Sequence, residues 1–148
     1  MLAAPRVASV WLSKATPSAT NGPCQLPMRA TFTPAARLHR PSEFALALKG
    51  KRVARGAMLV LNTPREVTTN ENGARLGLII AKRYAAQAVT RNAIKRVIRE
   101  AFRLKRQHLP PKDFVFRLHS KVAPASLTEL KKQVRVEVDT LLERAARC

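Results

Sequence analysis

The segment from about Thr90 to Gln107 constrains this chain most, because one helix there would carry cations on one side and apolar residues on the other. At about 100° per residue, the polar and cationic side chains fall within an arc of about 140°: Arg91, Asn92, Lys95, Arg96, Arg99, Arg103 and Arg106. An adjoining arc of about 160° holds Ile94, Val97, Ile98, Ala101, Phe102 and Leu104. Only Lys105 breaks the division. We expect the apolar side to pack against a sheet and the cationic side to meet a partner.

The cations of this segment lack nearby acids. Between Lys82 and Arg106 the only acidic residue is Glu100. Arg91, Lys95 and Arg99 follow one another at i,i+4, where like charges destabilise a helix. The whole chain has 28 Lys and Arg against 9 Asp and Glu, a net charge of +19. A solvated charged face is the alternative, but it is typical of helices with mixed charges. The imbalance favours a nucleic-acid backbone as partner.

The rest of the chain predicts one α+β domain over residues 34–147, a small α/β sandwich with helices over one sheet. A short helix is expected around Phe44–Leu48, preceded by Pro41-Ser42-Glu43 with Ser42 as a possible N-cap and stopped by Gly50. Apolar runs predict strands at 57–61, 75–81 and 113–119, the first two paired across the loop between them. A final amphipathic helix is expected at Leu127–Ala146. Residues 1–28 are interpreted as a disordered tail or as translation assigned from too early a start, with an organelle transit peptide as the less favoured alternative.

Several functional classes find no support in the residue pattern. The acids are scattered, so we expect no pair of carboxylates holding metal ions. Asp139 and Glu143 could share a helix face, but cations on the same helix balance them more simply. The three histidines are dispersed, so none is expected to act in an acid–base pair: His39, His108 and His119. No apolar run is long enough to cross a bilayer. We therefore expect a soluble intracellular protein with no catalytic residue, no metal ligand and no membrane or lipid partner.

The run from Arg91 to Arg103 (Arg-Asn-Ala-Ile-Lys-Arg-Val-Ile-Arg-Glu-Ala-Phe-Arg) resembles the Arg-Asn-Arg helix of the bacterial ribonuclease P protein family. The similarity extends upstream through Arg75–Leu78 and Ala81–Arg83. It continues downstream through Asp113–Val115 into the last helix. It covers about residues 37–146. A lone basic helix would be weak support, but this ordered series of matches is specific.

The resemblance implies a fold like the second domain of ribosomal protein S5, with one mainly antiparallel sheet and a left-handed βαβ crossover. It implies that the basic helix binds the catalytic RNA subunit through Arg91, Asn92, Lys95, Arg96, Arg99 and Arg103. Lys82 and Arg83, at the end of the second strand, are expected to extend the same patch. A cleft between the first helix and the sheet would hold the single-stranded 5′ leader of precursor tRNA, with Phe44, Leu48 and Leu61 on its walls. The RNA would carry the chemistry and its Mg²⁺, in the bacterial cytoplasm, and protein side chains would bind no cofactor.

Three positions depart from the family pattern. Ala93 stands where the family usually repeats Arg, so one RNA contact is missing or comes from a neighbour. Leu48 stands where a second cleft aromatic is common, and Leu61 where some members carry an aromatic. Leader contacts are therefore expected to depend more on shape and backbone charge. A ribosomal or RNA-chaperone protein of the same fold is the main alternative, and a DNA-binding regulator is a weaker one because a strand precedes the basic helix.

Overall fold

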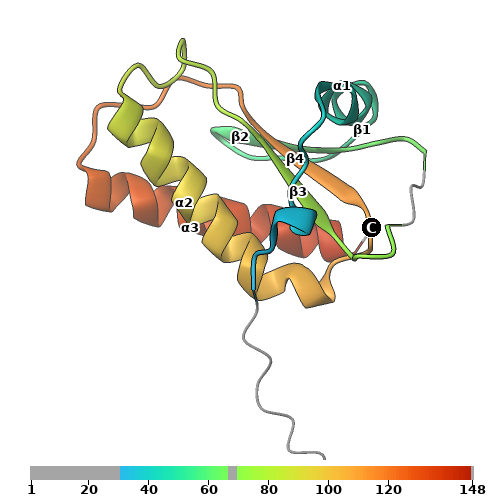
Figure 1. The fold of residues 1–148 in the computed structure, drawn as a ribbon. Helices are drawn as coiled ribbons and strands as arrows, with labels where there is room; N and C mark the ends of the chain where they lie inside the picture. Colours follow the sequence, from blue (N-terminus) through green and yellow to red (C-terminus); the bar gives the residue numbers. More distant parts are fainter. Residues whose placement is uncertain (1–30, 67–69, 148) are drawn as a thin grey trace, which may run out of the picture.

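A computed structural model describes residues 31–66 and 70–147 (Figure 1). Along the chain the elements are η1 (Pro34–Ala36), α1 (Pro41–Lys49), β1 (Lys51–Arg55), β2 (Leu59–Thr63), β3 (Arg75–Ile79), α2 (Ala88–Lys105), η2 (Arg106–His108), β4 (Asp113–Leu118) and α3 (Leu127–Ala146). The strands form one sheet in the order β1-β2-β4-β3. The pairs β1–β2 and β2–β4 are antiparallel, and β3–β4 is parallel. The expected α+β class and mainly antiparallel sheet are confirmed.

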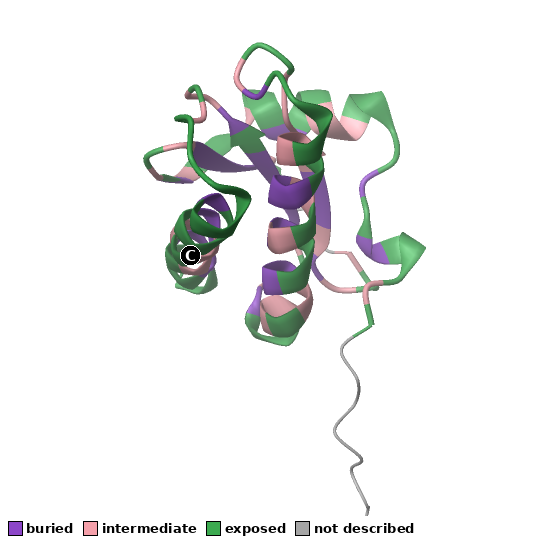
Figure 2. Cartoon of the chain, turned by 90° about the vertical axis from the view of Figure 1, so that its left-hand side faces the viewer, coloured by how far each residue is buried: buried purple, intermediate pink, exposed green. Residues whose placement is uncertain are grey.

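The two faces of the sheet are covered by different helices. Helices α2 and α3 lie on one face and α1 lies on the other (Figure 1). The chain leaves β3, returns through α2 and enters β4 beside β3, so the unit is a βαβ crossover between parallel neighbours. Followed in Figures 1 and 2, this crossover is left-handed, as the resemblance implies. The sheet therefore separates α1 from α2 and α3, and the two sides can meet only around its edges, such as β3.

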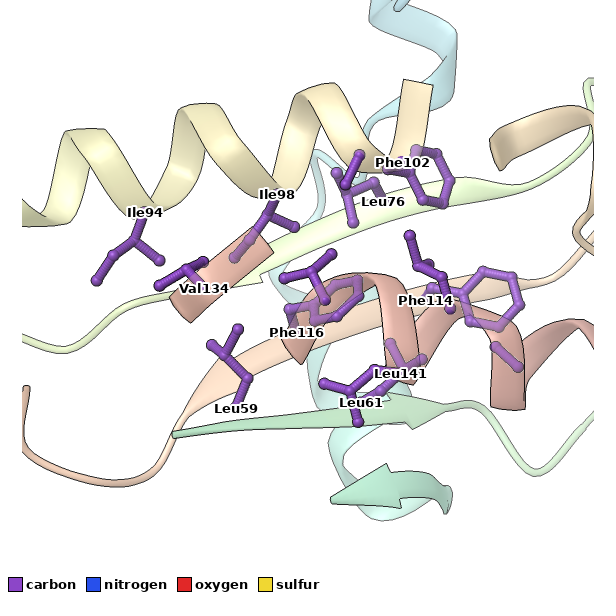
Figure 3. Close-up of a cluster of buried hydrophobic side chains, with 14 of the residues drawn as sticks. Leu59, Leu61, Leu76, Ile94, Ile98, Phe102, Phe114, Phe116, Val134 and Leu141 are labelled. Atoms are coloured by element: carbon purple, nitrogen blue, oxygen red, sulfur yellow. The ribbon is translucent and has the colours of Figure 1, made fainter. Parts of the chain in front are cut away.

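The main core lies between the sheet and helices α2 and α3 (Figure 3). Alternate residues of β4, Phe114, Phe116 and Leu118, point into it because successive strand residues face opposite ways. From α2, Ile94 and Ile98 are almost fully buried in the same core, which confirms the predicted apolar side of that helix. Val134 and Leu141 of α3 complete it in Figure 3.

The predicted strand pairing is wrong. The strands at 57–61 and 75–81 do not form a hairpin: β2 and β3 lie on either side of β4. The physical reason is in β4, where Val115 is fully buried on one face and Phe116 on the other. A strand that is apolar on both faces is favoured at the centre of a sheet, where helices cover both sides.

Strand β1 was not predicted, because its sequence Lys-Arg-Val-Ala-Arg reads as a charged surface segment. It is the edge strand beside β2, and its register shifts between Arg52 and Ala54. Charged side chains and a bulge are common on edge strands, where they oppose pairing with another sheet. The turn that follows is held by Glu137 of α3, whose Oε1 accepts the backbone N–H groups of Met58 and Leu59, each at 2.8 Å.

Helix α1 begins one residue earlier than its expected cap. Pro41 occupies the first helical position and Arg40 is the N-cap, so Ser42 lies inside the first turn. The fixed φ of proline suits that first position, and Pro has no N–H to leave unpaired there. The carboxylate of Glu43 accepts the backbone N–H of Arg40 at 3.2 Å.

An ion-pair network ties α1 to the sheet. The Arg75 guanidinium donates to both carboxylate oxygens of Asp113 at 2.8 Å and to Glu43 at 2.9 Å. The strongest influence on Arg75 is the hydrogen bond to Asp113, and its pKa is raised. Partial burial opposes ionisation of Glu43, but hydrogen bonds from Arg75, Arg40 and His39 outweigh it and lower the Glu43 pKa. The network therefore fixes α1 over the first residues of β3 and β4.

Lys105, the exception in the helical projection, faces α3. Its Nζ lies 3.3 Å from Asp139 Oδ1 and 3.1 Å from Glu143 Oε1. The two acids considered as a metal pair are therefore partners of a lysine that joins α2 to α3. Leu104 and Leu127, both expected on packed faces, are 49% and 40% exposed because they lie at helix ends, beyond the main helix–sheet contact.

Candidate nucleic-acid interface

Helix α2 presents a cationic side to solvent, here called the α2 basic face: Asn92, Lys95, Arg96, Arg99 and Arg103. Figure 2 shows this helix with buried residues toward the sheet and exposed residues along the opposite side. Asn92, Arg96 and Arg99 are exposed, whereas Lys95 and Arg103 are half-buried. The division expected from the sequence is present, and the packed side of α2 leaves these five side chains outside the core.

Within the described part of the chain, Lys95, Arg96 and Arg99 have no ion pair and no side-chain hydrogen bond. Lys95 and Arg99 are spaced i,i+4, and Arg96 and Arg99 are spaced i,i+3. Both spacings bring like charges together on one helix. A polyanion that approaches this face would therefore relieve the repulsion among these three cations.

Arg103 differs from these three because an acid meets it. Its guanidinium donates to the Glu100 carboxylate at 2.6 and 3.0 Å. This hydrogen bond lowers the pKa of Glu100 and raises that of Arg103. The pair is exposed, so it contributes little to stability. Arg103 thus brings less net positive charge to the face than its neighbours do.

Arg91 turns back toward its own chain. Its Nη1 donates to the carbonyl oxygens of Ala85 at 2.9 Å and Ala86 at 2.6 Å, in the segment before α2. Arg91 therefore fastens the entry to α2. An RNA contact through Arg91 would have to compete with these bonds or use the remaining N–H groups of its guanidinium.

Lys82 and Arg83 are exposed in the turn after β3, beyond the strand end where they were expected. The Arg83 guanidinium carbon lies 4.6 Å from the centroid of the Tyr84 ring, a cation–π contact. The contact holds the Arg83 side chain against the turn. Both cations belong to the segment that leads into α2.

The second candidate surface is on the opposite side of the sheet, here called the α1 surface: Phe44, Leu48, Ile79 and Arg117. Phe44 is half-buried and packs against the small cluster of Leu38, Ala47 and Val115. Leu48 is 37% exposed and follows Phe44 by four residues, so both lie on one side of α1.

Phe44 lies close to strand β3 because residue 77 has no side chain. A Cβ at Gly77 would lie 2.7 Å from Phe44 Cε1 and 2.8 Å from Leu38 Cδ1. Real Cβ contacts at such distances require the neighbours to move. Gly77 therefore lets the aromatic ring rest on the sheet.

Leu61 does not line this surface. We expected it beside Phe44 and Leu48, but its side chain is fully buried in the main core, on the α2–α3 side of β2. Strand residues alternate between faces, and Leu59 and Leu61 share the core face. The expectation fails because the sequence alone did not fix which face of β2 each residue occupies.

A small hollow joins the two candidate surfaces at the edge of β3. It has a volume of about 150 Å³ and is lined by Phe32, Arg37, Leu38, Phe44, Leu76, Gly77, Leu78, Lys95 and Arg99. The segment at 32–38 passes this edge, where Leu38 donates its N–H to the Leu76 carbonyl oxygen at 3.0 Å. The Phe44 side and the cationic side therefore meet at one opening.

Three functional candidates were missed from the sequence: Arg117, Arg37 and Phe32. Arg117 is exposed on the α1 side of β4, paired in register with Ile79 of β3. Strand alternation with the buried Phe116 and Leu118 could have indicated it. Arg37 lies over the Phe32 ring at 4.8 Å from its centroid, and both residues line the hollow. No sequence signal marked Phe32, because it precedes the first predicted element.

The described acids are largely engaged in structural contacts. Glu43 and Asp113 meet Arg75, Glu100 meets Arg103, and Asp139 and Glu143 meet Lys105. Over residues 31–66 and 70–147, no three His, Cys, Asp or Glu side chains are grouped as metal ligands would be. Among the helices in that part of the chain, none has the length and apolar character of a bilayer span.

Comparison with known proteins assigns the fold and the family. A family model described as Ribonuclease P matches residues 32–145. The ribonuclease P protein component of Bordetella petrii is 62% identical over 118 residues, which cover 78% of this chain and 96% of that protein. That of Paraburkholderia xenovorans is 40% identical over 125 residues, covering 80% and 86%.

Solved structures agree on the architecture. A Staphylococcus aureus RNase P protein superposes with a TM-score of 0.57 at 26% identity, covering 78% of this chain and 93% of that one. The Thermotoga maritima RNase P protein gives a TM-score of 0.53 at 21% identity, covering 76% and 96%. The family model and the two relatives favour the tRNA-processing family over the ribosomal and RNA-chaperone alternatives. The chain belongs to the ribonuclease P protein component family.

Proposed function

We propose that this chain is the protein subunit of a bacterial ribonuclease P, acting in the cytoplasm in the 5′ maturation of tRNA. The α2 basic face, with Lys82 and Arg83 beside it, binds the catalytic RNA. The α1 surface binds the 5′ leader of precursor tRNA. The two surfaces lie mainly on opposite faces of one sheet, and they meet at the β3 edge, where Phe44, Lys95 and Arg99 line one hollow.

The observation that supports this best is the set of cations Lys95, Arg96 and Arg99, which have no partner in the described part of the chain. Each phosphate that they neutralise releases a condensed counterion, and repulsion along α2 falls at the same time. Arginine also offers planar, bidentate contact to phosphate. A strong dependence of RNA affinity on salt follows.

Leader binding rests on Phe44 and on the cation Arg117 of the same face. A base stacked on an aromatic ring is stabilised by about 1–3 kcal/mol, or about 5- to 150-fold in affinity. Mature tRNA has no leader and gains none of this. The protein therefore favours precursor over product by differential binding. Leu48 adds apolar contact without an aromatic face, so we assign stacking to Phe44.

The protein supplies binding rather than hydrolysis. Most of its described carboxylates form ion pairs with Arg75, Arg103 or Lys105, and that of Glu137 accepts backbone N–H groups. We assign the chemical step, and the Mg²⁺ that activates water for it, to the RNA subunit. The protein contributes by neutralising phosphates that would otherwise repel one another in the folded RNA and the bound substrate.

The test is cleavage of precursor tRNA by the catalytic RNA at low Mg²⁺, with and without the protein. We expect the wild-type chain to restore cleavage and the variant Lys95→Ala/Arg96→Ala/Arg99→Ala to fail. The matched control Arg55→Ala/Arg144→Ala/Arg147→Ala removes three exposed cations elsewhere and should stimulate like wild type. The protein alone should cut nothing.

Two outcomes would contradict the proposal. If wild type gives no stimulation, the basic face serves another RNA. If the control loses as much as the α2 variant, stimulation depends on total charge rather than on this face. Replacing Phe44 by Leu should leave affinity for the catalytic RNA unchanged while reducing the preference for precursor over mature tRNA.

A further inference from the structure

A second group of cations lies beside the α2 basic face, on helix α3. A groove of about 410 Å³ runs between α2 and α3, lined by Arg96, Val97, Glu100, Lys131, Lys132 and Arg135. Lys131 and Lys132 are exposed, and the side chain of Arg135 is 37% exposed. The lining contains four cations and one acid.

The acids near this groove are already paired. Glu100 is held by Arg103 at 2.6 Å, and Asp139 by Arg135 at 3.0 Å and Lys105 at 3.3 Å. Within the described residues, this leaves Arg96, Lys131 and Lys132 without an acidic partner. Lys131 and Arg135 are also spaced i,i+4, so α3 repeats the like-charge spacing found on α2.

Helix α3 is not cationic along its whole length. Its second half holds Glu137, Asp139 and Glu143, which face the β1–β2 turn and Lys105. Its first half holds one acid, Glu129, against three cations, Lys131, Lys132 and Arg135. The surplus of positive charge is therefore confined to the first half of α3, where it adjoins Arg96 of the basic face. A helix that needed only solvation would not separate its charges in this way.

We propose that the α2–α3 groove binds a second stretch of the catalytic RNA backbone, with Lys131 and Lys132 contacting phosphates next to those held by Arg96. The occupant is the catalytic RNA rather than the substrate leader, because the groove and α1 lie on opposite faces of the sheet (Figure 1). The inference rests on the proposed function and widens its RNA interface from one helix to two.

The experiment compares binding of the catalytic RNA, without substrate, by wild type, by Lys131→Ala/Lys132→Ala and by the control Arg144→Ala/Arg147→Ala. The control removes the same charge from two exposed positions at the C-terminal end of α3, Arg144 in the helix and Arg147 at its C-cap. Two lost phosphate contacts make the slope of log affinity against log salt shallower by about 1.8, so between about 50 and 200 mM salt the variant's affinity should fall about 12-fold less than that of wild type. Thermal unfolding should be unchanged, because both lysines are exposed.

The α2 variant Lys95→Ala/Arg99→Ala separates this inference from the proposed function. If it weakens binding while Lys131→Ala/Lys132→Ala matches the control, the α2–α3 groove proposal is wrong and the proposed function stands. If neither variant differs from the control, the proposed function itself fails. If the lysine variant keeps its affinity for the catalytic RNA but loses preference for precursor tRNA, the groove binds substrate and the inference is overturned.

Discussion

Replacing Gly77 with Ala should disturb the α1 surface without touching the α2 basic face. The added Cβ would lie 2.7 Å from Phe44 Cε1, 2.8 Å from Leu38 Cδ1 and 3.0 Å from Val115 Cγ2. Carbon atoms pack best at about 3.5–4.0 Å, so the ring and the leucine must both withdraw. The ring of Phe44 would then lift from β3, where it is held against the sheet in the wild-type chain.

The magnitude follows from two opposing effects. Overpacking a fitted site lowers the free energy of unfolding by about 1–3 kcal/mol. Alanine restricts the unfolded chain more than glycine does, which raises the free energy of unfolding by about 0.5–1 kcal/mol. We expect a net loss of about 0.5–2 kcal/mol, measured by urea unfolding. Precursor tRNA affinity should fall in the holoenzyme, while affinity of the free protein for the catalytic RNA should not change.

A double-mutant cycle tests the cause. In a Phe44→Ala background the closest contact is absent, so the Gly77→Ala penalty should shrink by about 0.5–1 kcal/mol. The Leu38 contact remains and keeps the penalty from vanishing. If Gly77→Ala has the same effect on the free energy of unfolding in both backgrounds, the ring does not rest on Gly77 and the reasoning is refuted.

Three other predictions use different contacts. Glu137→Ala should lower the free energy of unfolding by about 2 kcal/mol, because two backbone N–H groups lose their acceptor. The control Glu129→Ala, on the same helix, should lower it less. Equal losses in the two variants would show that the turn contact has no special role. The Glu43 pKa is lowered in the folded chain, so its contribution to stability is complete above 4.5 and is lost as the pH falls below that value toward the folded pKa. Acid titration of unfolding should therefore be shallower in Glu43→Gln, and an identical titration would contradict the network. Arg91→Ala should weaken catalytic-RNA binding less than Arg99→Ala in a filter-binding assay, since its guanidinium already bonds the Ala85 and Ala86 carbonyls; the reverse order would make Arg91 a primary RNA contact.

Periodicity predicted α2 and α3 well because each has one continuous apolar face. Helix α3 was predicted at the residues it occupies, and α2 begins at Ala88 rather than Thr90. The same helical projection places Arg91 at the boundary of the apolar arc, between Ile98 and Phe102. A cation at such a boundary can turn inward to backbone carbonyls, as Arg91 does. Periodicity reports the angle of a side chain but not the acceptors near it.

Strand order could not be read from the chain in the same way. Pairing depends on which residues are buried on each face, and β4 is apolar on both, which placed it between β2 and β3. The face occupied by Leu61 follows from that arrangement and not from its residue type. The hollow at β3 also depends on four separated segments, at 32–38, 44, 76–78 and 95–99. Such juxtapositions need the tertiary structure, although the resemblance had indicated both surfaces.

The cations of this chain fall into two groups, which differ in whether they bond other groups of the fold and not in residue type. Arg75, Lys105 and Arg106 bond carboxylates or backbone carbonyls of elements distant in sequence, and Arg91 bonds backbone carbonyls of the segment just before α2. Those contacts would persist in the free protein. Lys95, Arg96, Arg99, Lys131 and Lys132 lack such partners among the described residues and lie together on α2 and α3. Their mutual repulsion opposes the folded state of the free protein, and under the proposed function the bound catalytic RNA would relieve it. The proposal therefore predicts that RNA binding and folding are linked through these cations, which have no partner among the described residues.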